Sequence, residues 1–218
     1  MDDSILRRIT ELTENGRANR ALGRGEDGVD ELTAQALANG FAPGEVLDAL
    51  TAGMSAIGAR FAAGKAFVPN MLMAARAMNA GMTHLKPYFG SGEVERKGTF
   101  IIGTVFGDLH DIGKNLVAMM VEGSGWEVID LGVDVSPEAF VSAASEQPHA
   151  VIGLSALLTT TMGNMATVIE ALRAANPGTR VIVGGAPLSH EYAATIGADG
   201  YSPNPVGAVE LLNELVAA

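Results

Sequence analysis

The chain has 218 residues, of which 48% are hydrophobic and 18% charged, a composition that excludes a disordered chain and allows one or two domains with buried cores. Fourteen basic against 25 acidic side chains leave a formal net charge of −11, which argues against nucleic acid and anionic membranes as partners. The sequence has no cysteine, which excludes disulfides, thiolate metal sites and a thiol nucleophile.

Residues 1–88 are predicted to form a bundle of four helices. Apolar side chains recur three and four residues apart in four segments, at about 4–15, 27–38, 43–61 and 69–85. The short loops between them favour antiparallel packing of neighbouring helices. Methionines recur along the fourth segment, and filling of a helical core is the simplest explanation for them.

Residues 89–98 have the glycine-rich and charged composition of a linker, and the pattern beyond them is different. Short β-branched runs alternate with helical segments over residues 99–218. The predicted strands are 99–105, 127–131, 150–154, 180–183 and 199–201, and the predicted helices are 112–124, 137–146, 161–175, 188–196 and 205–216. This alternation predicts a five-stranded parallel sheet of flavodoxin-like, Rossmann-like α/β type. Such sheets bind ligands at the carboxyl ends of their strands.

Two glycine-rich segments resemble phosphate loops, and neither fits one. Residues 23–28 match G-x-G-x-x-G but follow no predicted strand. Residues 107–114 have one residue too many for a Walker A loop, and Asn115 stands where a magnesium-binding hydroxyl is required. The second segment nevertheless places His110 at the end of the first strand with Asp108 two residues away, and metal-ligating histidines commonly donate their other ring N–H to a carboxylate.

Three short motifs follow the first, third and fourth predicted strands. They are Asp108-x-His110-x-x-Gly113, Ser155-x-Leu157 and Gly184-Gly185. In this order and spacing they resemble the cobalamin-binding domain of B12-dependent methyltransferases, including the B12-binding module of cobalamin-dependent methionine synthase. With the helical bundle, the whole chain is similar to the stand-alone corrinoid proteins of methylamine, glycine-betaine and methoxy-compound methyltransferase systems.

The resemblance implies a cobalamin site in the α/β domain. His110 would be the lower axial ligand of cobalt, Asp108 its hydrogen-bond partner, and Thr161 the hydroxyl that completes a relay. The nucleotide tail of the cofactor would enter a channel lined or flanked by Thr104, Gly113, Ser155, Leu157, Thr159, Gly184 and Gly185. Pro203 and Pro205 depart from the family pattern on the tail side.

The resemblance also implies a role for the bundle. Phe61 and Val68 would lie over the methyl group on cobalt and keep water from it, with Met71 and Met73 as neighbours. For the methionines, an adaptable lid and plain core packing stay open as alternatives.

By the same resemblance the chain is a methyl carrier and no catalyst by itself. Co(I) would accept a methyl group from a substrate-specific methyltransferase, and methylcobalamin would deliver it to a second methyltransferase acting on tetrahydrofolate or a thiol, with a reductive activator as a further partner. The alternatives are a cobalamin-dependent sensor or regulator, against which the lack of a basic patch argues, and a mutase subunit, against which the bundle argues. Because no signal-peptide pattern and no apolar run of about 18 residues is present, we expect a cytoplasmic location.

Overall fold

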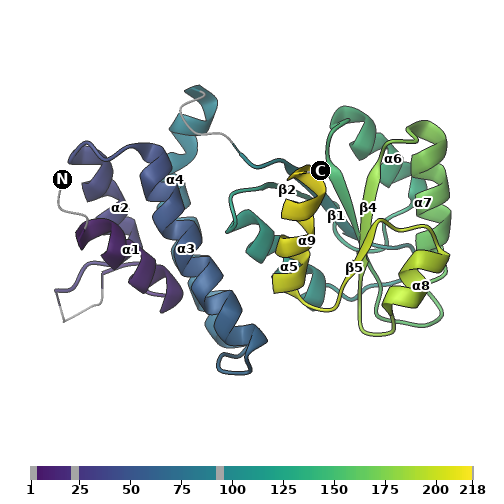
Figure 1. Cartoon of the computed structure of the whole chain (residues 1–218), viewed down its shortest axis with the longest axis horizontal. Helices are drawn as coiled ribbons and strands as arrows, with labels where there is room; N and C mark the ends of the chain where they lie inside the picture. The colour runs from purple at the N-terminus through teal and green to yellow at the C-terminus, as the bar shows by residue number, and fades with distance from the viewer. Residues whose placement is uncertain (1–3, 21–24, 92–95, 218) are drawn as a thin grey trace. The chain divides into compact units, whose positions relative to one another are not determined.

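The computed structural model describes residues 4–20, 25–91 and 96–217, and these residues form two compact units. One unit comprises Met1–Arg96 with Gly123–Gly125, and the other comprises Lys97–Glu122 with Trp126–Ala218. The first is helical and the second is an α/β structure (Figure 1). We call them the helical unit and the α/β unit.

The helical unit contains α1 (Ser4–Glu14), α2 (Val29–Ala38), α3 (Pro43–Ala62) and α4 (Val68–Ser91). Helix α3 packs against α1 and α4, and α2 packs against α4. The helical N-terminal region predicted from the apolar spacing is therefore confirmed. Helix α4 continues through Pro87 to Ser91, although an internal proline removes one backbone hydrogen bond and crowds the preceding turn. The first residues of the expected linker are thus helical, and residues 92–95 of it lie outside the described part of the chain.

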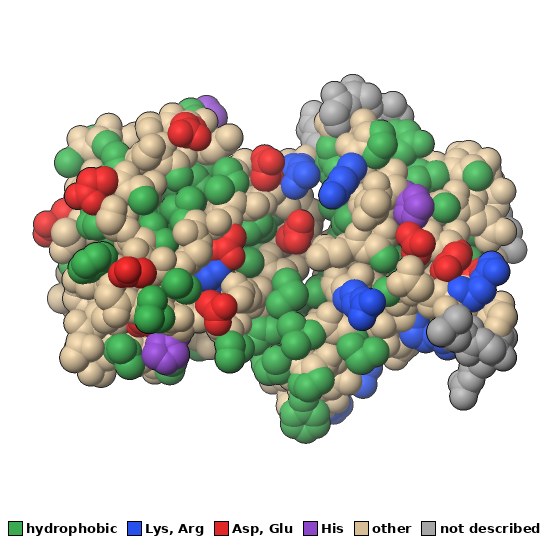
Figure 2. Space-filling view, turned by 180° about the vertical axis from the view of Figure 1, so that it is seen from behind, with side chains coloured by type: hydrophobic (Ala, Val, Ile, Leu, Met, Phe, Trp, Pro, Cys, Tyr) green, Lys and Arg blue, Asp and Glu red, His purple; other side chains and the backbone are tan. Residues whose placement is uncertain are grey.

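Charge is distributed unequally between the two units. Residues 97–218 carry four basic and 13 acidic side chains, whereas residues 1–96 carry ten basic and 12 acidic ones. Figure 2 shows most of the visible Lys and Arg side chains on the helical unit, at the right of that view. The negative charge of the chain therefore belongs mainly to the α/β unit.

The α/β unit is built on a parallel sheet in which the described residues form five strands in the order β2-β1-β3-β4-β5. The strands are β1 (Thr99–Thr104), β2 (Glu127–Asp130), β3 (Val151–Ser155), β4 (Arg180–Gly184) and β5 (Gly200–Ser202). The helices are α5 (Ile112–Glu122), α6 (Pro137–Glu146), α7 (Asn164–Ala175), α8 (His190–Thr195) and α9 (Pro205–Ala217). This is the predicted flavodoxin-like topology.

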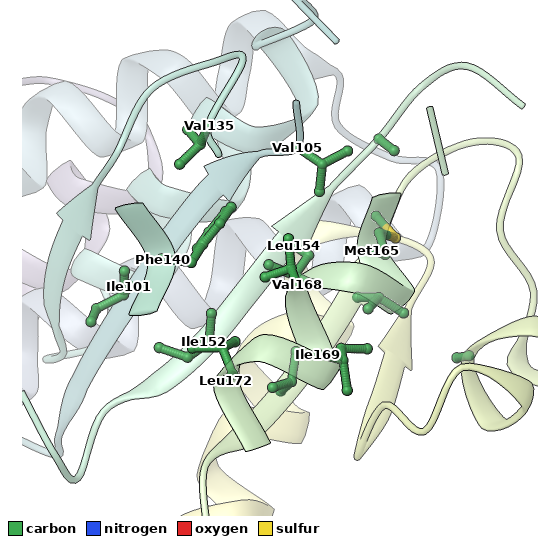
Figure 3. Close-up of a cluster of buried hydrophobic side chains, with 14 of the residues drawn as sticks. Ile101, Val105, Val135, Phe140, Ile152, Leu154, Met165, Val168, Ile169 and Leu172 are labelled. Atoms are coloured by element: carbon green, nitrogen blue, oxygen red, sulfur yellow. The ribbon is translucent and has the colours of Figure 1, made fainter. Parts of the chain in front are cut away.

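Both faces of the sheet are covered by helices, which explains the continuous apolar strands. Alternate residues of β1 serve opposite faces: Ile101 packs with α6 and α7, and Phe100 packs with α5 and α9. Figure 3 shows the first of these clusters, where Phe140 of α6 and Leu172 of α7 meet the strand side chains.

The strand order brings the three motifs of the sequence together. At the carboxyl edge of the sheet Thr104 of β1 is in register with Ser155 of β3, and Ser155 is in register with Gly184 of β4. Because β1, β3 and β4 are direct neighbours, the loops that follow them lie side by side.

Candidate functional site

His110 lies on the loop between β1 and α5, which we call the His110 loop and define as residues 105–111. Gly107 has φ of +80°, and the N–H of Asp108 donates to the carbonyl of Val105 at 3.1 Å, so the chain turns tightly at the end of the strand. The side chain of His110 is 52% exposed, and its Nδ1 lies 2.9 Å from Oδ1 of Asp108. Between the residues that the structure describes, no hydrogen bond engages its Nε2.

Asp108 is fully buried and collects hydrogen bonds from two loops. Its Oδ1 accepts from Nδ1 and the backbone N–H of His110. Its Oδ2 accepts from the backbone N–H of Leu157 at 2.8 Å, from that of Leu158 at 3.3 Å and from the Thr161 hydroxyl at 2.7 Å. The Asp108-His110-Thr161 relay implied by the resemblance is thus present as geometry.

The hydrogen bonds also decide the charge of Asp108. Burial by itself would raise the pKa of its carboxyl, but the donors from Leu157, Thr161 and His110 outweigh burial and hold this pKa well below its usual range. Asp108 is therefore a carboxylate, and its Oδ1 accepts a hydrogen bond from Nδ1 of His110. In a neutral His110 ring with its proton on Nδ1, Nε2 is the nitrogen whose lone pair can bind a metal.

A cavity of about 470 Å³ begins beside His110 and extends into the α/β unit. Its walls come from the carboxyl-terminal halves of β1, β3 and β4, from the first turns of α5 and from the segment Ser202–Pro205 before α9. Phe100, Ile102 and Ile182 give it an apolar interior. Its volume lies in the range of small-molecule and cofactor sites.

The surface around His110 is also apolar. Several large side chains on the loops at this edge are more than one-third exposed, an unusual amount for hydrophobic groups on neighbouring loops. They are Phe106, Leu109, Ile112, Val133, Leu157 and Leu158. A flat, largely apolar ligand placed over His110 would cover them.

The fold itself requires glycine at position 185 and leaves little space for a side chain at position 184. Gly185 has φ of +143°, and a Cβ on it would lie 1.8 Å from the carbonyl oxygen of Ala156. A Cβ on Gly184 would lie 3.1 Å from the carbonyl oxygen of Ser202. Both glycines line the cavity. The tight packing of Gly185 against Ala156 and of Gly184 against Ser202 therefore also shapes the cavity wall.

The structure brings together only part of the expected site. His110, Gly113, Ser155, Leu157, Gly184 and Gly185 line the cavity. Thr104 is buried outside that lining, and its hydroxyl donates to the carbonyl of His110 at 2.8 Å. Thr159 is exposed and outside the lining as well.

The residues expected to cover the methyl group belong to the helical unit. Phe61 lies in the last turn of α3 and Val68 begins α4, and both are half-buried. Met71 is 3% exposed and so is part of the helical core, whereas Met73 is 56% exposed. Within α4 the two methionines therefore have different surroundings.

Sequence reasoning missed a buried ion pair next to the site. The side chain of Lys114 is 2% exposed, and its ammonium group bonds Asp130 at the end of β2 and Oδ1 of Asn115. This is the lysine of the segment that resembled a phosphate loop, and here its charge is satisfied by a carboxylate of the protein. The pair joins helix α5 to the end of β2, 16 positions away in the sequence, and leaves no local signal, so only the tertiary structure identifies it.

Comparison with known proteins identifies the class to which this fold and site belong. A family model described as a B12 binding domain matches residues 98–210, and a second model of the same description matches residues 14–86. The chain belongs to the B12-binding family, and the cofactor of this family is cobalamin or a related corrinoid.

Its similar relatives are corrinoid proteins. One from Desulfitobacterium hafniense is 42% identical over 78% of this chain and 82% of the relative. Dimethylamine corrinoid protein 1 of Methanosarcina acetivorans is 43% identical over 80% of this chain and 84% of the relative. Among solved structures, a chain of the methanol:cobalamin methyltransferase complex of Methanosarcina barkeri aligns with a TM-score of 0.85 and 28% identity, covering all of this chain and 81% of the other.

The residues present fit a corrinoid. An exposed imidazole with Nδ1 held by a carboxylate is the usual state of a histidine that ligates a metal through Nε2. The apolar surface around His110 suits the face of a macrocycle, and the neighbouring cavity suits an appended nucleotide. No helix in the described ranges is both long and apolar enough to span a membrane.

Proposed function

We propose that the chain is a methyl-carrier corrinoid protein of a methyltransferase system. Its bound corrinoid would supply a cobalt ion that takes a methyl group from a substrate-specific methyltransferase and gives it to a second methyltransferase acting on tetrahydrofolate or a thiol. A reductive activator would reduce any cofactor that has become oxidised, so that it can accept a methyl group again. Relatives named as methylamine corrinoid proteins support this assignment.

The observation that carries the proposal is the pairing of His110 with Asp108 at the mouth of the cavity. His110 would bind cobalt through Nε2. Asp108, positioned by Leu157 and Thr161, would keep the proton on Nδ1 and the ring in a fixed orientation. The cavity lined by Ser155 and Gly185 would hold the nucleotide tail.

Reconstitution with hydroxocobalamin tests the cofactor site. The full-length apoprotein is mixed with hydroxocobalamin, and binding is followed by absorbance for the native chain, His110→Ala and His149→Ala. His149 is an exposed histidine in the turn before β3, at the opposite edge of the sheet, and is the matched control. We expect the native chain and His149→Ala to bind alike, and His110→Ala to bind at least about 10-fold more weakly.

Electron paramagnetic resonance of the Co(II) form then tests the ligand directly. In protein grown with histidine carrying the heavy nitrogen isotope, the nitrogen superhyperfine splitting of the cobalt lines changes only if a histidine nitrogen is bound. An unchanged pattern would contradict the role of His110, and absence of binding to the native chain would contradict the cofactor site.

Transfer assays separate a carrier from a sensor. The methylated, reconstituted protein is incubated with tetrahydrofolate- or thiol-dependent methyltransferases, and loss of the methyl group from cobalt is measured. A methyl carrier is demethylated in an enzyme-dependent manner. Stable methylcobalamin with every acceptor enzyme would favour the regulator instead.

A further inference from the structure

Asp134, on the loop between β2 and α6, has an unusual backbone conformation. Its φ is +56°, and among the residues that the structure describes it is the one non-glycine residue with positive φ. An L-residue in this region is disfavoured by about 1 kcal/mol, although aspartate and asparagine tolerate it better than most residues. A residue kept in such a conformation points to a specific local requirement.

The requirement is visible in the two hydrogen bonds that Asp134 makes. Its Oδ1 accepts from the backbone N–H of Gly107 at 2.7 Å, and its backbone N–H donates to the carbonyl of Asp108 at 3.0 Å. Both partners belong to the His110 loop, one on each side of the Asp108 Cα. Asp134 therefore holds the backbone at the point from which the Asp108 side chain projects.

The same loop is held from its other side by different groups. There the backbone of Leu157 and the hydroxyl of Thr161 bond the carboxylate of Asp108, and Nδ2 of Asn164 donates to the carbonyl of Phe106 at 2.7 Å. The segment after β3 thus positions the Asp108 side chain, while the segment after β2 positions its main chain.

We propose that Asp134 is a positioning residue for the His110 ligand. This inference rests on the proposed function and adds to it a residue that touches neither His110 nor the cavity lining. Without the Oδ1 acceptor, the N–H of Gly107 turns to solvent and the turn that carries Asp108 and His110 loosens. The imidazole then spends less of its time in the orientation that cobalt requires.

The experiment compares Asp134→Gly, Asp134→Asn and Asn176→Gly in the full chain. Glycine keeps the positive φ but has no acceptor, whereas asparagine keeps both the acceptor and the conformation. Asn176→Gly is the control, because it removes a similar bond, from the N–H of Gly178 to Oδ1 at 3.1 Å, in the loop between α7 and β4 at the opposite edge of the sheet.

We expect Asp134→Gly to raise the dissociation constant for hydroxocobalamin about 10-fold and to lower the fraction of Co(II) with a histidine nitrogen bound. Asp134→Asn restores both values to within about twofold, and Asn176→Gly leaves both unchanged. In the apoprotein, hydrogen exchange of the Gly107 amide becomes faster in Asp134→Gly only. If Asp134 only stabilised the fold, Asp134→Gly would not lower the nitrogen hyperfine signal of the bound histidine.

Two negative results have distinct meanings. Unchanged affinity and histidine ligation in Asp134→Gly, with normal binding by the native chain, overturn this inference and leave the proposed function intact. Failure of the native chain to bind hydroxocobalamin overturns the proposed function, and the positioning role with it.

Discussion

The two units of the molecule keep their functional regions in shape by different means. In the α/β unit the carboxyl edge of the sheet is organised by directional bonds to buried polar groups, and the buried charged side chains found in the described residues, Asp108 and Lys114, both belong to this unit. In the helical unit the interior of α3 and α4 is apolar, with Met54 and Met78 fully buried. The comparison teaches that directional bonds to buried charged groups organise the carboxyl edge of the sheet, whereas apolar side-chain volume fills the interior of α3 and α4.

The largest effect is expected where two backbone segments of the α/β unit meet. Gly185→Ala places a Cβ 1.8 Å from the Ala156 carbonyl at a φ of +143°, so the end of β4 must move. We expect a loss of about 4 kcal/mol in the free energy of unfolding, measured by urea denaturation of the apoprotein.

Gly113→Ala is its matched control, because Gly113 also lines the cavity but a Cβ there meets no heavy atom within 4 Å. In helix α5 this change should leave stability unchanged or raise it by about 0.5 kcal/mol. Equal unfolding midpoints for the two variants would contradict the close approach of β3 and β4.

Volume in the helical unit gives the next largest effect. Met78→Ala removes a fully buried side chain and should lower the free energy of unfolding by about 3 kcal/mol. Met73→Ala, in the same helix but at a 56% exposed position, should change it by less than about 0.5 kcal/mol. Similar losses for both variants, measured by thermal unfolding, would remove the distinction between core and surface methionines in α4.

Removal of one directional bond in the α/β unit should have a smaller effect. Thr161→Val replaces the hydroxyl that donates to Asp108 with a methyl group of similar size, at an expected loss of about 2 kcal/mol. Thr159→Val, at an exposed position two residues earlier, should change stability by less than about 0.5 kcal/mol. Both are measured by urea denaturation, and equal values would argue that the Thr161 hydroxyl does not help to hold the Asp108 carboxylate.

The smallest effect concerns a polar cap in the helical unit. Burial opposes ionisation of Glu31, but the backbone N–H groups of Arg20 and Gly28 outweigh it and lower the pKa of this carboxyl below its usual value of 4.5. Because the folded-state pKa is the lower one, the stabilisation is present above pH 4.5 and is lost as the pH falls through the folded-state value.

We expect Glu31→Gln to lower the free energy of unfolding by about 0.5 kcal/mol at neutral pH and to have a smaller effect in acid. The measurement is urea denaturation of both proteins at neutral pH and at about pH 3. A difference that grows on acidification would show that the sign of the pKa shift is wrong.

Much of this architecture could be predicted from local patterns. The β-branched runs around Ile101, Ile152 and Ile182 indicate strands buried on both faces, and the register of the sheet then carries the residues after Thr104, Ser155 and Gly184 to one edge. The helical spacing in residues 1–88 likewise identifies the N-terminal region as helical. These predictions succeeded because the period of apolar residues is set over short stretches of chain.

The contacts that shape the site could not be predicted in this way. Nothing near Asp134 in the sequence indicates a bond to Gly107, 27 positions away, and nothing near Lys114 indicates Asp130. The sequence places Gly185 at the expected channel but does not indicate its close approach to the Ala156 carbonyl, which excludes a side chain there. Long-range hydrogen bonds and steric contacts depend on loop paths, which local pattern does not determine.

The sequence by itself determined the family, the parallel sheet and the histidine at its carboxyl edge, because these depend on residue identity and on periodic burial of apolar side chains. Only the tertiary structure decided which groups hold that histidine. The pKa of the Asp108 carboxyl is held low because donors from the His110 loop and from the loop after β3 converge on it, while Asp134 of the loop after β2 bonds the Asp108 backbone. That convergence is a property of the folded chain, since desolvation and hydrogen-bond geometry exist only after the loops are brought together.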